Sequence, residues 1–297
     1  MPASQFTQQL FNAVSLGAIY ALIAIGYTMV YSILNMINFA HGDIFMMSLY
    51  FAFFSVTLFH MPWPLGFIAA LVVTAVMGAV IEKLAYKPLR TAPKNSVLVS
   101  AIGASFLLEN LATYLFSGRP QAFPEIPVLM TGFTFGGVNV RLISLLTIAV
   151  TIISLLILTY IIHRTKTGMA MRAVSTDFEI ARTMGINENT IVTLVFIIGS
   201  ALAAIGGFLW GVKYTSILPL MGIVPGMKCF IAAVVGGIGN IAGAVLGGFI
   251  IGMSEILAVA LFPSISGYRD VFAFVMLIVI LMVKPAGLLG TTATEKV

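Results

Sequence analysis

The chain has 297 residues, of which 60% are apolar and only 8% are charged, with a formal net charge of +5. A soluble domain carries about 25% charged residues, so these charges are too few to cover a water-exposed surface of this size. We therefore expect a protein embedded in lipid, where the backbone must pair internally and only helices or a closed barrel are possible. The apolar runs are continuous rather than alternating, which favours helices.

About eight apolar runs follow one another, and most approach the roughly 20 residues needed to cross a bilayer. They cover approximately Leu10–Leu34, Ile44–Phe59, Leu65–Ile81, Ser96–Phe116, Leu142–Ile162, Ile191–Trp210, Gly226–Phe262 and Val271–Val283. The seventh run is long and rich in small residues, and Pro219 and Pro225 lie just before it. We expect an all-α transmembrane bundle of about eight spans, with broken or re-entrant helices near 211–262.

Two connections hold most of the cations, whereas residues 1–82 contain no Lys or Arg. One carries Lys83, Lys87, Arg90 and Lys94, and the other carries Arg164, Lys166, Arg172 and Arg182. Two spans separate them, so both face one side, which the positive-inside rule assigns to the cytoplasm. The amino terminus and the segment Gly118–Val140 are then expected outside. By its charge, the carboxyl end with Lys284 belongs inside, which requires an odd number of crossings and conflicts with a count of eight.

The segment between the first two runs is polar and reads Asn35-Met36-Ile37-Asn38-Phe39-Ala40-His41-Gly42-Asp43. One interpretation is a polar turn in which Asp43 caps the next helix. The other is a break in a helix that lines a path through the membrane. His41 and Asp43 lack further ligands at suitable spacing, so we expect no metal site here.

Two carboxylates lie inside apolar runs, at Glu109, which Asn110 follows, and at Glu255. An ionised side chain within a membrane is costly and is by default a functional candidate. A structural hydrogen bond to a neighbouring helix is the simpler interpretation of each. Neither has a His or Lys partner at helical spacing, so the sequence does not indicate a proton relay.

Small residues recur every four positions after Gly236. The two sets are Gly239, Gly243 and Gly247, and Ala244, Gly248 and Gly252. Each set lies along one helix face and lets another backbone approach closely, which favours helix packing. A substrate-facing break at Gly236–Asn240 is the alternative. No Lys-Ser or Lys-Thr follows these glycines, so they are not a Walker nucleotide-binding loop.

The second basic connection, His163–Thr190, contains a short predicted helix at about Asp177–Met184. Thr176 as N-cap and Glu179 three residues later read as a capping box, and Gly185 is a suitable left-handed stop. A two-turn helix is marginal alone in water. Its apolar positions at helical spacing therefore suggest docking onto a partner. A helix that lies on lipid or on its own chain remains the alternative.

Five segments, in order, carry a resemblance to a known family. They are Asn38–Gly42, Gly168–Val174, Ala181–Asn187, the glycine run from Gly236, and Lys284–Gly290. Together they resemble the LivH-type permease of branched-chain amino-acid ABC transporters over nearly the whole chain. The resemblance implies a single transmembrane permease domain, 1–297, with a cytoplasmic coupling loop at about 163–190. It also implies a multi-pass protein of the bacterial inner membrane that translocates leucine, isoleucine and valine.

The same resemblance implies partners. These are a LivM-type second permease, two cytoplasmic ATPase subunits and a periplasmic substrate-binding protein, with membrane lipid around the chain and no nucleic acid. We expect no catalytic residue, cofactor or metal in this chain. The inside loop is similar to the Glu-Ala-Ala-x-x-x-Gly core of ABC-importer coupling loops, which Glu179, Ala181 and Gly185 match and Ile180 departs from.

Two sets of site residues follow. The ATPase-coupling residues are expected to be Gly168, Arg172, Ala173, Asp177, Phe178, Glu179, Ala181, Met184, Gly185 and Ile186. The substrate path is expected to include Asn38, His41, Glu109, Asn110, Gly236, Gly237, Gly239 and Asn240, because a zwitterion crossing an apolar bundle needs hydrogen-bonding groups.

Three alternatives remain beside this interpretation. A relative of the same family could import urea, short amides or other amino acids, since nothing in the chain reads the substrate side chain. A self-sufficient secondary transporter would use carboxylates to couple an ion. An intramembrane enzyme is disfavoured because no paired nucleophile and base occurs within the runs.

Overall fold

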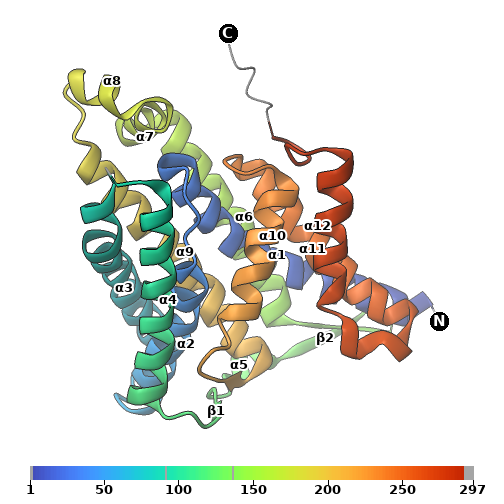
Figure 1. Cartoon of the computed structure of the whole chain (residues 1–297). Coiled ribbons are helices and arrows are strands. Elements are labelled where there is room, and N and C mark those ends of the chain that lie inside the picture. The colour runs from blue at the N-terminus through green and yellow to red at the C-terminus, as the bar shows by residue number, and fades with distance from the viewer. Residues whose placement is uncertain (1–2, 91, 136, 291–297) are drawn as a thin grey trace.

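The computed structural model describes residues 3–90, 92–135 and 137–290. In this part of the chain, nine apolar helices form one bundle (Figure 1). They are α1 (Ala3–Leu34), α2 (Ala40–Thr57), α3 (Trp63–Ile81), α4 (Lys94–Phe116), α6 (Leu142–Arg164), α9 (Glu188–Tyr214), α10 (Ile223–Gly236), α11 (Ile241–Leu261) and α12 (Val271–Val283). Six are long and apolar enough to cross a membrane, and α2, α10 and α12 are shorter. The expected all-α membrane bundle is confirmed.

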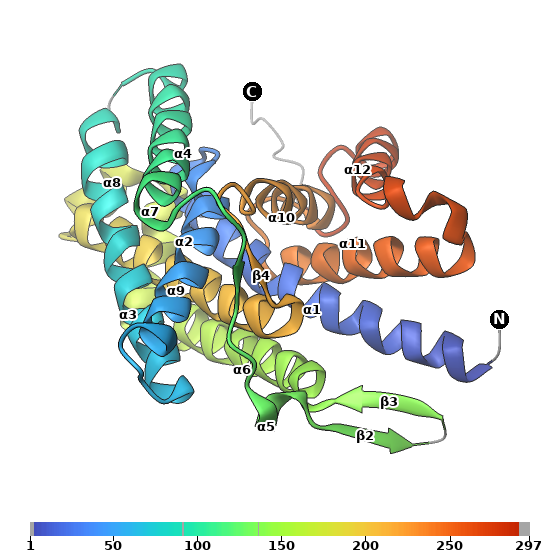
Figure 2. The same cartoon turned by 90° about the horizontal axis from the view of Figure 1, so that it is seen from below.

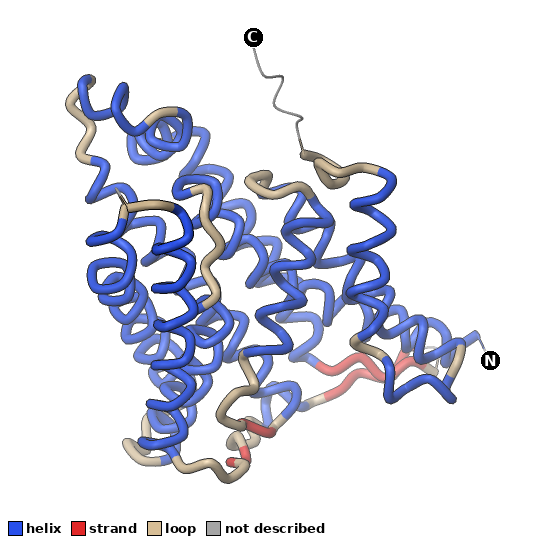
Figure 3. The backbone as a smooth tube through the Cα atoms, in the orientation of Figure 1, coloured by secondary structure: helices blue, strands red, loops and turns tan. Residues whose placement is uncertain are grey.

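Short elements connect these helices. At one end of the bundle they are η1 (Glu82–Tyr86), η2 (Lys87–Leu89), α7 (Lys166–Thr176) and α8 (Phe178–Thr183). At the other end they are β1 (Gln121–Ala122), α5 (Pro127–Met130), β2 (Gly132–Phe135), β3 (Val138–Arg141), β4 (Ser216–Ile217) and η3 (Pro263–Tyr268). β2 and β3 form an antiparallel hairpin beside the start of α1, and β1 pairs with β4 (Figures 2 and 3).

The end that holds residues 82–93 and 165–187 is termed the basic end, and the end that holds residues 117–141 is termed the hairpin end. Two hydrogen bonds join the first basic connection to the start of α9, which directly follows the second basic connection. Arg90 donates to Asn189 Oδ1 (2.9 Å), and Thr193 Oγ1 donates to Glu82 Oε2 (2.7 Å). Both basic connections therefore lie at one end, as the charge pattern predicts.

The seventh apolar run holds two helices rather than one, and this resolves the conflict over the number of crossings. α10 ends at Gly236 and α11 begins at Ile241. Gly237 and Gly239 between them have φ values of +111° and +88°, which favour glycine. The irregular segment 215–222 precedes α10, so the expected breaks near 211–262 are these two connections. Nine alternating helices place Lys284 at the basic end (Figure 1).

A further break separates α1 from α2. Residues 35–39 leave the basic end as a non-helical segment, and α2 begins inside the bundle rather than at its edge (Figure 3). The expectation that Asp43 caps α2 is wrong. Phe39 occupies the N-cap position, and the Asp43 carboxylate accepts a hydrogen bond from the Ser105 hydroxyl of α4 instead. The break that the second interpretation requires is therefore observed, while its place on a path through the membrane stays a prediction.

α1 lies at the centre of the bundle and packs against α6, α9, α10 and α11. Glycines permit the closest of these contacts. A Cβ atom on Gly252 would lie 2.4 Å from Gly17 Cα of α1, and one on Gly247 would lie 1.9 Å from Ala232 O of α10. On α11, Gly243 and Gly247 therefore pack against α10, and Gly248 and Gly252 pack against α1, which confirms the packing interpretation for these residues. Gly239 precedes α11 and makes no such close approach.

Candidate functional site

At the basic end, the connection between α6 and α9 folds into the two short helices α7 and α8 (Figure 1). Thr165 Oγ1 caps α7 by accepting from Gly168 N (3.0 Å). A Cβ atom on Gly168 would lie 2.1 Å from Ile161 O, so only glycine lets α7 fold back this closely onto α6. Arg172 then donates to Ile162 O (2.7 Å) and ties α7 to the end of α6. Sequence patterning did not predict α7.

α8 begins at a different cap from the one expected. Asp177 Oδ1 accepts from Ile180 N (2.9 Å), whereas Thr176 Oγ1 donates to Arg172 O (2.9 Å) within α7. The predicted capping box is therefore wrong by one residue, because Thr176 still belongs to the preceding helix. The helix itself agrees with the expected bounds to within one residue at each end. Gly185 follows it with a φ of +81°, as predicted.

The apolar side chains of α7 and α8 divide into two groups. Ala181 is buried and Phe178 is half-buried against the chain's own core. Met169, Ile180 and Met184 are 64%, 60% and 75% exposed. The apolar surface available to a partner thus consists of these three side chains. The expected set of coupling residues contains only Met184 of them, although Ile180 belongs to the apolar stripes of the predicted helix. Of the other expected coupling residues, Arg172, Asp177, Glu179 and Gly185 are exposed, Ala173 and Ile186 are half-buried, and Gly168 is buried.

The first expected path residues lie where α2 begins. Asn38 Oδ1 accepts from Tyr86 OH (2.8 Å), and Asn38 Nδ2 has no hydrogen-bond partner among the described residues. His41 Nε2 lies 3.1 Å from Ile23 O. Because a carbonyl oxygen only accepts, this nitrogen must carry a proton and donate. His41 therefore holds the first turn of α2 against α1, while Asn38 keeps both N–H donors of Nδ2 free within the described chain.

Two buried carboxylates lie on the adjoining parts of α2 and α4. Asp43 Oδ1 has no hydrogen-bond partner, and neither Asp43 nor Glu109 forms an ion pair within the described chain. Ser105, which donates to Asp43, and Glu109 share one face of α4 because they are four residues apart. Asn110 is exposed instead and donates to Phe106 O (2.7 Å). A cationic group would be stabilised beside the two carboxylates.

The first turns of α2 and α10 meet inside the bundle. A Cβ atom on Gly42 would lie 2.6 Å from Gly222 O and 3.0 Å from Gly226 Cα. Each helix N-terminus exposes unpaired N–H groups and carries a partial positive charge. An anionic group placed beside these N-termini would be stabilised, and the carboxylate of Asp43 lies in the same first turn of α2. The two environments together complement a zwitterion.

The turn Gly236–Asn240 lies away from this region, at the basic end. Asn240 Oδ1 caps α11 by accepting from Gly243 N (3.0 Å), and Asn240 Nδ2 donates to Leu289 O (2.9 Å). The expected path residues are thus divided among three places. Asn38, His41 and Glu109 lie where the start of α2 meets α4, Asn110 lies on the exposed surface of α4, and the remaining residues lie in this turn.

A cavity of about 700 Å³ at the basic end brings residues of both expected sets together. Arg172 of α7, Gly239 and Asn240 line it, with Tyr31 and Asn35 from the end of α1. The cavity therefore connects α7 with the turn at which α10 ends.

Sequence reasoning missed an ion cluster that joins α1, α10, α11 and the start of α12. Lys228 Nζ lies 2.7 Å from Glu255 Oε2 and 2.6 Å from Asp270 Oδ1, and Arg269 Nε lies 2.8 Å from Glu255 Oε1. Tyr20 OH donates to Glu255 Oε2 (3.0 Å). Lys228 and Glu255 are only 2% and 1% exposed. The charges of the two cations and the two carboxylates cancel, which reduces the free-energy cost of burying them. A search at helical spacing could not find partners that lie on different helices.

A helical membrane bundle with a polar region at interrupted helices is the architecture of a membrane transport protein. The family described as "Branched-chain amino acid transport system / permease component" matches residues 9–281, and the chain belongs to this family.

Individual relatives agree with this assignment. The chain is 42% identical to the high-affinity branched-chain amino acid transport system permease protein BraD of Pseudomonas aeruginosa and 41% identical to LivH of Escherichia coli (strain K12). Each alignment covers 98% of both chains. The predicted resemblance to LivH-type permeases is confirmed. Among solved structures, PsaBC from Streptococcus pneumoniae in complex with Fab is similar with a TM-score of 0.51 and 13% identity, over 94% of this chain and 92% of that one. This likeness concerns the fold alone.

Proposed function

We propose that this chain is the membrane-spanning permease subunit of an importer that carries leucine, isoleucine and valine across the bacterial inner membrane. The observation that carries the proposal is the 41–42% identity, over 98% of each chain, to permeases named for high-affinity branched-chain amino acid transport. The sequence contains no Gly-Lys-Ser or Gly-Lys-Thr, so it has no Walker loop of its own. The energy then comes from ATP hydrolysed by partner chains.

Two cytoplasmic ATPase subunits are the partners at the basic end, one of them on α7 and α8. The exposed Met169, Ile180 and Met184 supply an apolar contact, and the charges of Arg172 and Glu179 orient it. A LivM-type second permease completes the membrane part, and a periplasmic binding protein delivers substrate at the hairpin end. This arrangement is supported by the position of both basic connections at one end of the bundle.

The substrate crosses beside the start of α2. The amino acid's carboxylate lies near the N-termini of α2 and α10, and its ammonium group lies near Asp43 and Glu109. Asn38 Nδ2 offers a further donor. These groups replace hydration that the substrate loses in the bundle. Because α7 borders the same cavity as the turn after α10, movement of α7 by an ATPase reaches the end of α10.

An uptake measurement tests the substrate assignment. Cells that carry this chain with the ATPase, second-permease and binding-protein genes of its own operon should take up labelled leucine. Excess isoleucine or valine should compete, whereas urea and acetamide should not. If urea or acetamide competes and valine does not, the substrate belongs to the alternative class of this family. Uptake that persists without the ATPase genes would favour a secondary transporter.

A further inference from the structure

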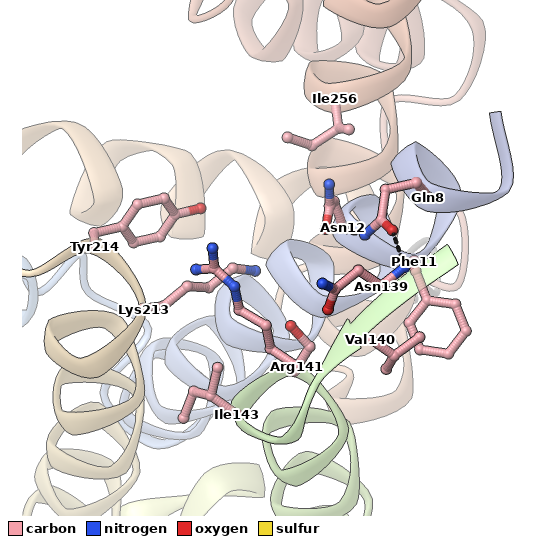
Figure 4. A pocket seen from close by; sticks show the side chains of 11 residues that line it. Gln8, Phe11, Asn12, Asn139, Val140, Arg141, Ile143, Lys213, Tyr214 and Ile256 are labelled. Atoms are coloured by element: carbon pink, nitrogen blue, oxygen red, sulfur yellow. Dashed lines mark hydrogen bonds between the residues drawn. The ribbon is translucent and has the colours of Figure 1, made fainter. Parts of the chain in front are cut away.

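A cavity of about 420 Å³ lies at the hairpin end, between the first turns of α1, the end of α9 and the start of α6 (Figure 4). Its polar lining consists of Gln8, Asn12, Asn139, Arg141, Ser144, Lys213 and Tyr214. The proposed transport path does not use this cavity, because none of its lining residues belongs to α2, α4 or α10.

The charges that line the cavity are all positive. Arg141 and Lys213 both reach into it (Figure 4), and no Asp or Glu of the described chain lines it. Neither cation forms an ion pair with any described residue. Lys213 Nζ has one hydrogen bond, to Ser15 Oγ (2.9 Å), and so keeps donors free. Two like charges beside one cavity repel each other, so an anion between them would relieve this repulsion.

The remaining lining limits the kind of anion. Asn12 and Ser144 add neutral polar groups, while Phe11 and Ile143 add apolar walls. An arginine guanidinium and a lysine ammonium together suit a phosphate group, whose oxygens accept several donors. The shared chemistry is therefore that of a phosphate or phosphodiester anion.

An apolar surface continues from the cavity along α6. Ile148 and Ile152 follow Ser144 at intervals of four residues and so lie on its face of the helix. Ile152 is exposed, and Ile148 is half-buried. A free phosphate ion would leave this surface unused, whereas a lipid would place its acyl chains there. Basic pockets between transmembrane helices bind anionic lipid headgroups on the cytoplasmic side, and the same charge-assisted contacts to a phosphate are available to a cavity at the opposite end.

We propose that this cavity binds the phosphodiester headgroup of an anionic phospholipid, with Arg141 and Lys213 on the phosphate and the acyl chains along α6. The assembled transporter, purified in a neutral detergent, tests this by thermal unfolding with added dihexanoyl phosphatidylglycerol, dihexanoyl phosphatidylcholine or inorganic phosphate. Phosphatidylglycerol should raise the unfolding midpoint of the unmodified protein, and the other two should have little effect. Arg141→Gln should raise the half-saturating concentration of phosphatidylglycerol about tenfold, because one charge-assisted contact to the phosphate is lost.

Three further variants sharpen the result. Lys213→Gln should weaken binding similarly, and Lys213→Arg should keep it. Arg119→Gln removes an exposed cation from the same end of the protein and should leave binding unchanged. Lys213 also donates a hydrogen bond to buried Ser15, so Lys213→Gln can fail to fold. In that case the Arg141→Gln variant still tests the proposal, because Arg141 is exposed. The proposal is overturned if phosphatidylcholine stabilises equally, if Arg119→Gln and Arg141→Gln have equal effects, or if inorganic phosphate alone gives the full shift, which would indicate a free-anion site.

Discussion

Asp43 and Glu109 are buried carboxylates in an apolar bundle, and neither is ion-paired among the described residues. A structural carboxylate in a membrane is normally paired, so the unpaired state favours contact with a cationic substrate group. We predict that Asp43→Asn and Glu109→Gln each reduce ATP-driven leucine uptake about tenfold to a hundredfold, because a hydrogen bond to a charged group contributes about 1.5–3 kcal/mol. Uptake into proteoliposomes at matched protein levels measures this.

Asn110→Ala is the matched control, because Asn110 adjoins Glu109 on α4 but is exposed and bonds only its own helix. It should transport normally. If all three variants transport equally well, Asp43 and Glu109 serve packing alone and the proposed path lies elsewhere.

The ion cluster around Glu255 makes a different prediction, because its members are paired. Glu255→Gln or Lys228→Met should lower the thermal unfolding midpoint of the assembled transporter, since each leaves the cluster unbalanced by one charge, at a cost of up to about 3–5 kcal/mol. The double variant should lose less than the sum of the two single losses, because both buried charges are then gone. Lys284→Met, at an exposed site, is the control. Strictly additive losses would show that the two residues act independently.

These residues show what could be predicted from the sequence at this scale. Glu109, Glu255 and the Asn38–Asp43 segment stand out because polar groups are rare in the apolar runs. Their partners could not be predicted, since Ser105 reaches Asp43 from α4 and Lys228 reaches Glu255 from α10. Such contacts depend on how helices are arranged, which periodicity does not contain.

At the scale of elements, the long helices follow from their apolar length, and the short ones do not. α3, α4, α6 and α9 lie close to the predicted runs, because a continuous apolar length specifies each of them. α7 could not be predicted from the sequence, because its start is fixed by contacts to α6, including the close approach at Gly168. The boundary between α10 and α11 lies within one continuous apolar run, so hydropathy does not indicate it. Only the glycines at 236, 237 and 239 indicated a turn there.

The end of α8 carries the most direct test of the coupling role. Gly185 has a φ of +81°, and no described atom lies within 4 Å of an added Cβ, so a substitution there acts through backbone conformation and not through a clash. Gly185→Val should cost on the order of 1–2 kcal/mol locally and redirect the chain after α8. We predict normal membrane insertion, weaker recovery of the ATPases through a tag on this chain, and loss of uptake.

Gly185→Asn is the control for this prediction, because asparagine tolerates the left-handed region and adds similar bulk. It should retain the ATPases and most uptake. Equal loss with Asn and Val would contradict a conformational origin, and unchanged ATPase recovery with Val would contradict the coupling role itself.

For the whole molecule, the cation pattern predicts one orientation. With Cys229→Ala as background, single cysteines at Lys87, Arg172 and Glu125 report it, since these three positions are exposed. An impermeant thiol reagent added to cells with a permeable outer membrane should label position 125 and leave 87 and 172 unlabelled until the inner membrane is opened. Immediate labelling at 87 or 172, with protection at 125, would reverse the orientation.

Reconstitution measures the central claim, that this chain provides a path and partner ATPases provide the energy. Labelled leucine, carried by the binding protein, is presented to proteoliposomes that contain this chain alone or the chain assembled with the second permease and both ATPases, with and without ATP. We predict concentrative uptake only for the full assembly with ATP, and neither ATP hydrolysis nor accumulation for the chain alone. Accumulation by the chain alone, driven by an ion gradient and independent of ATP, would contradict this account.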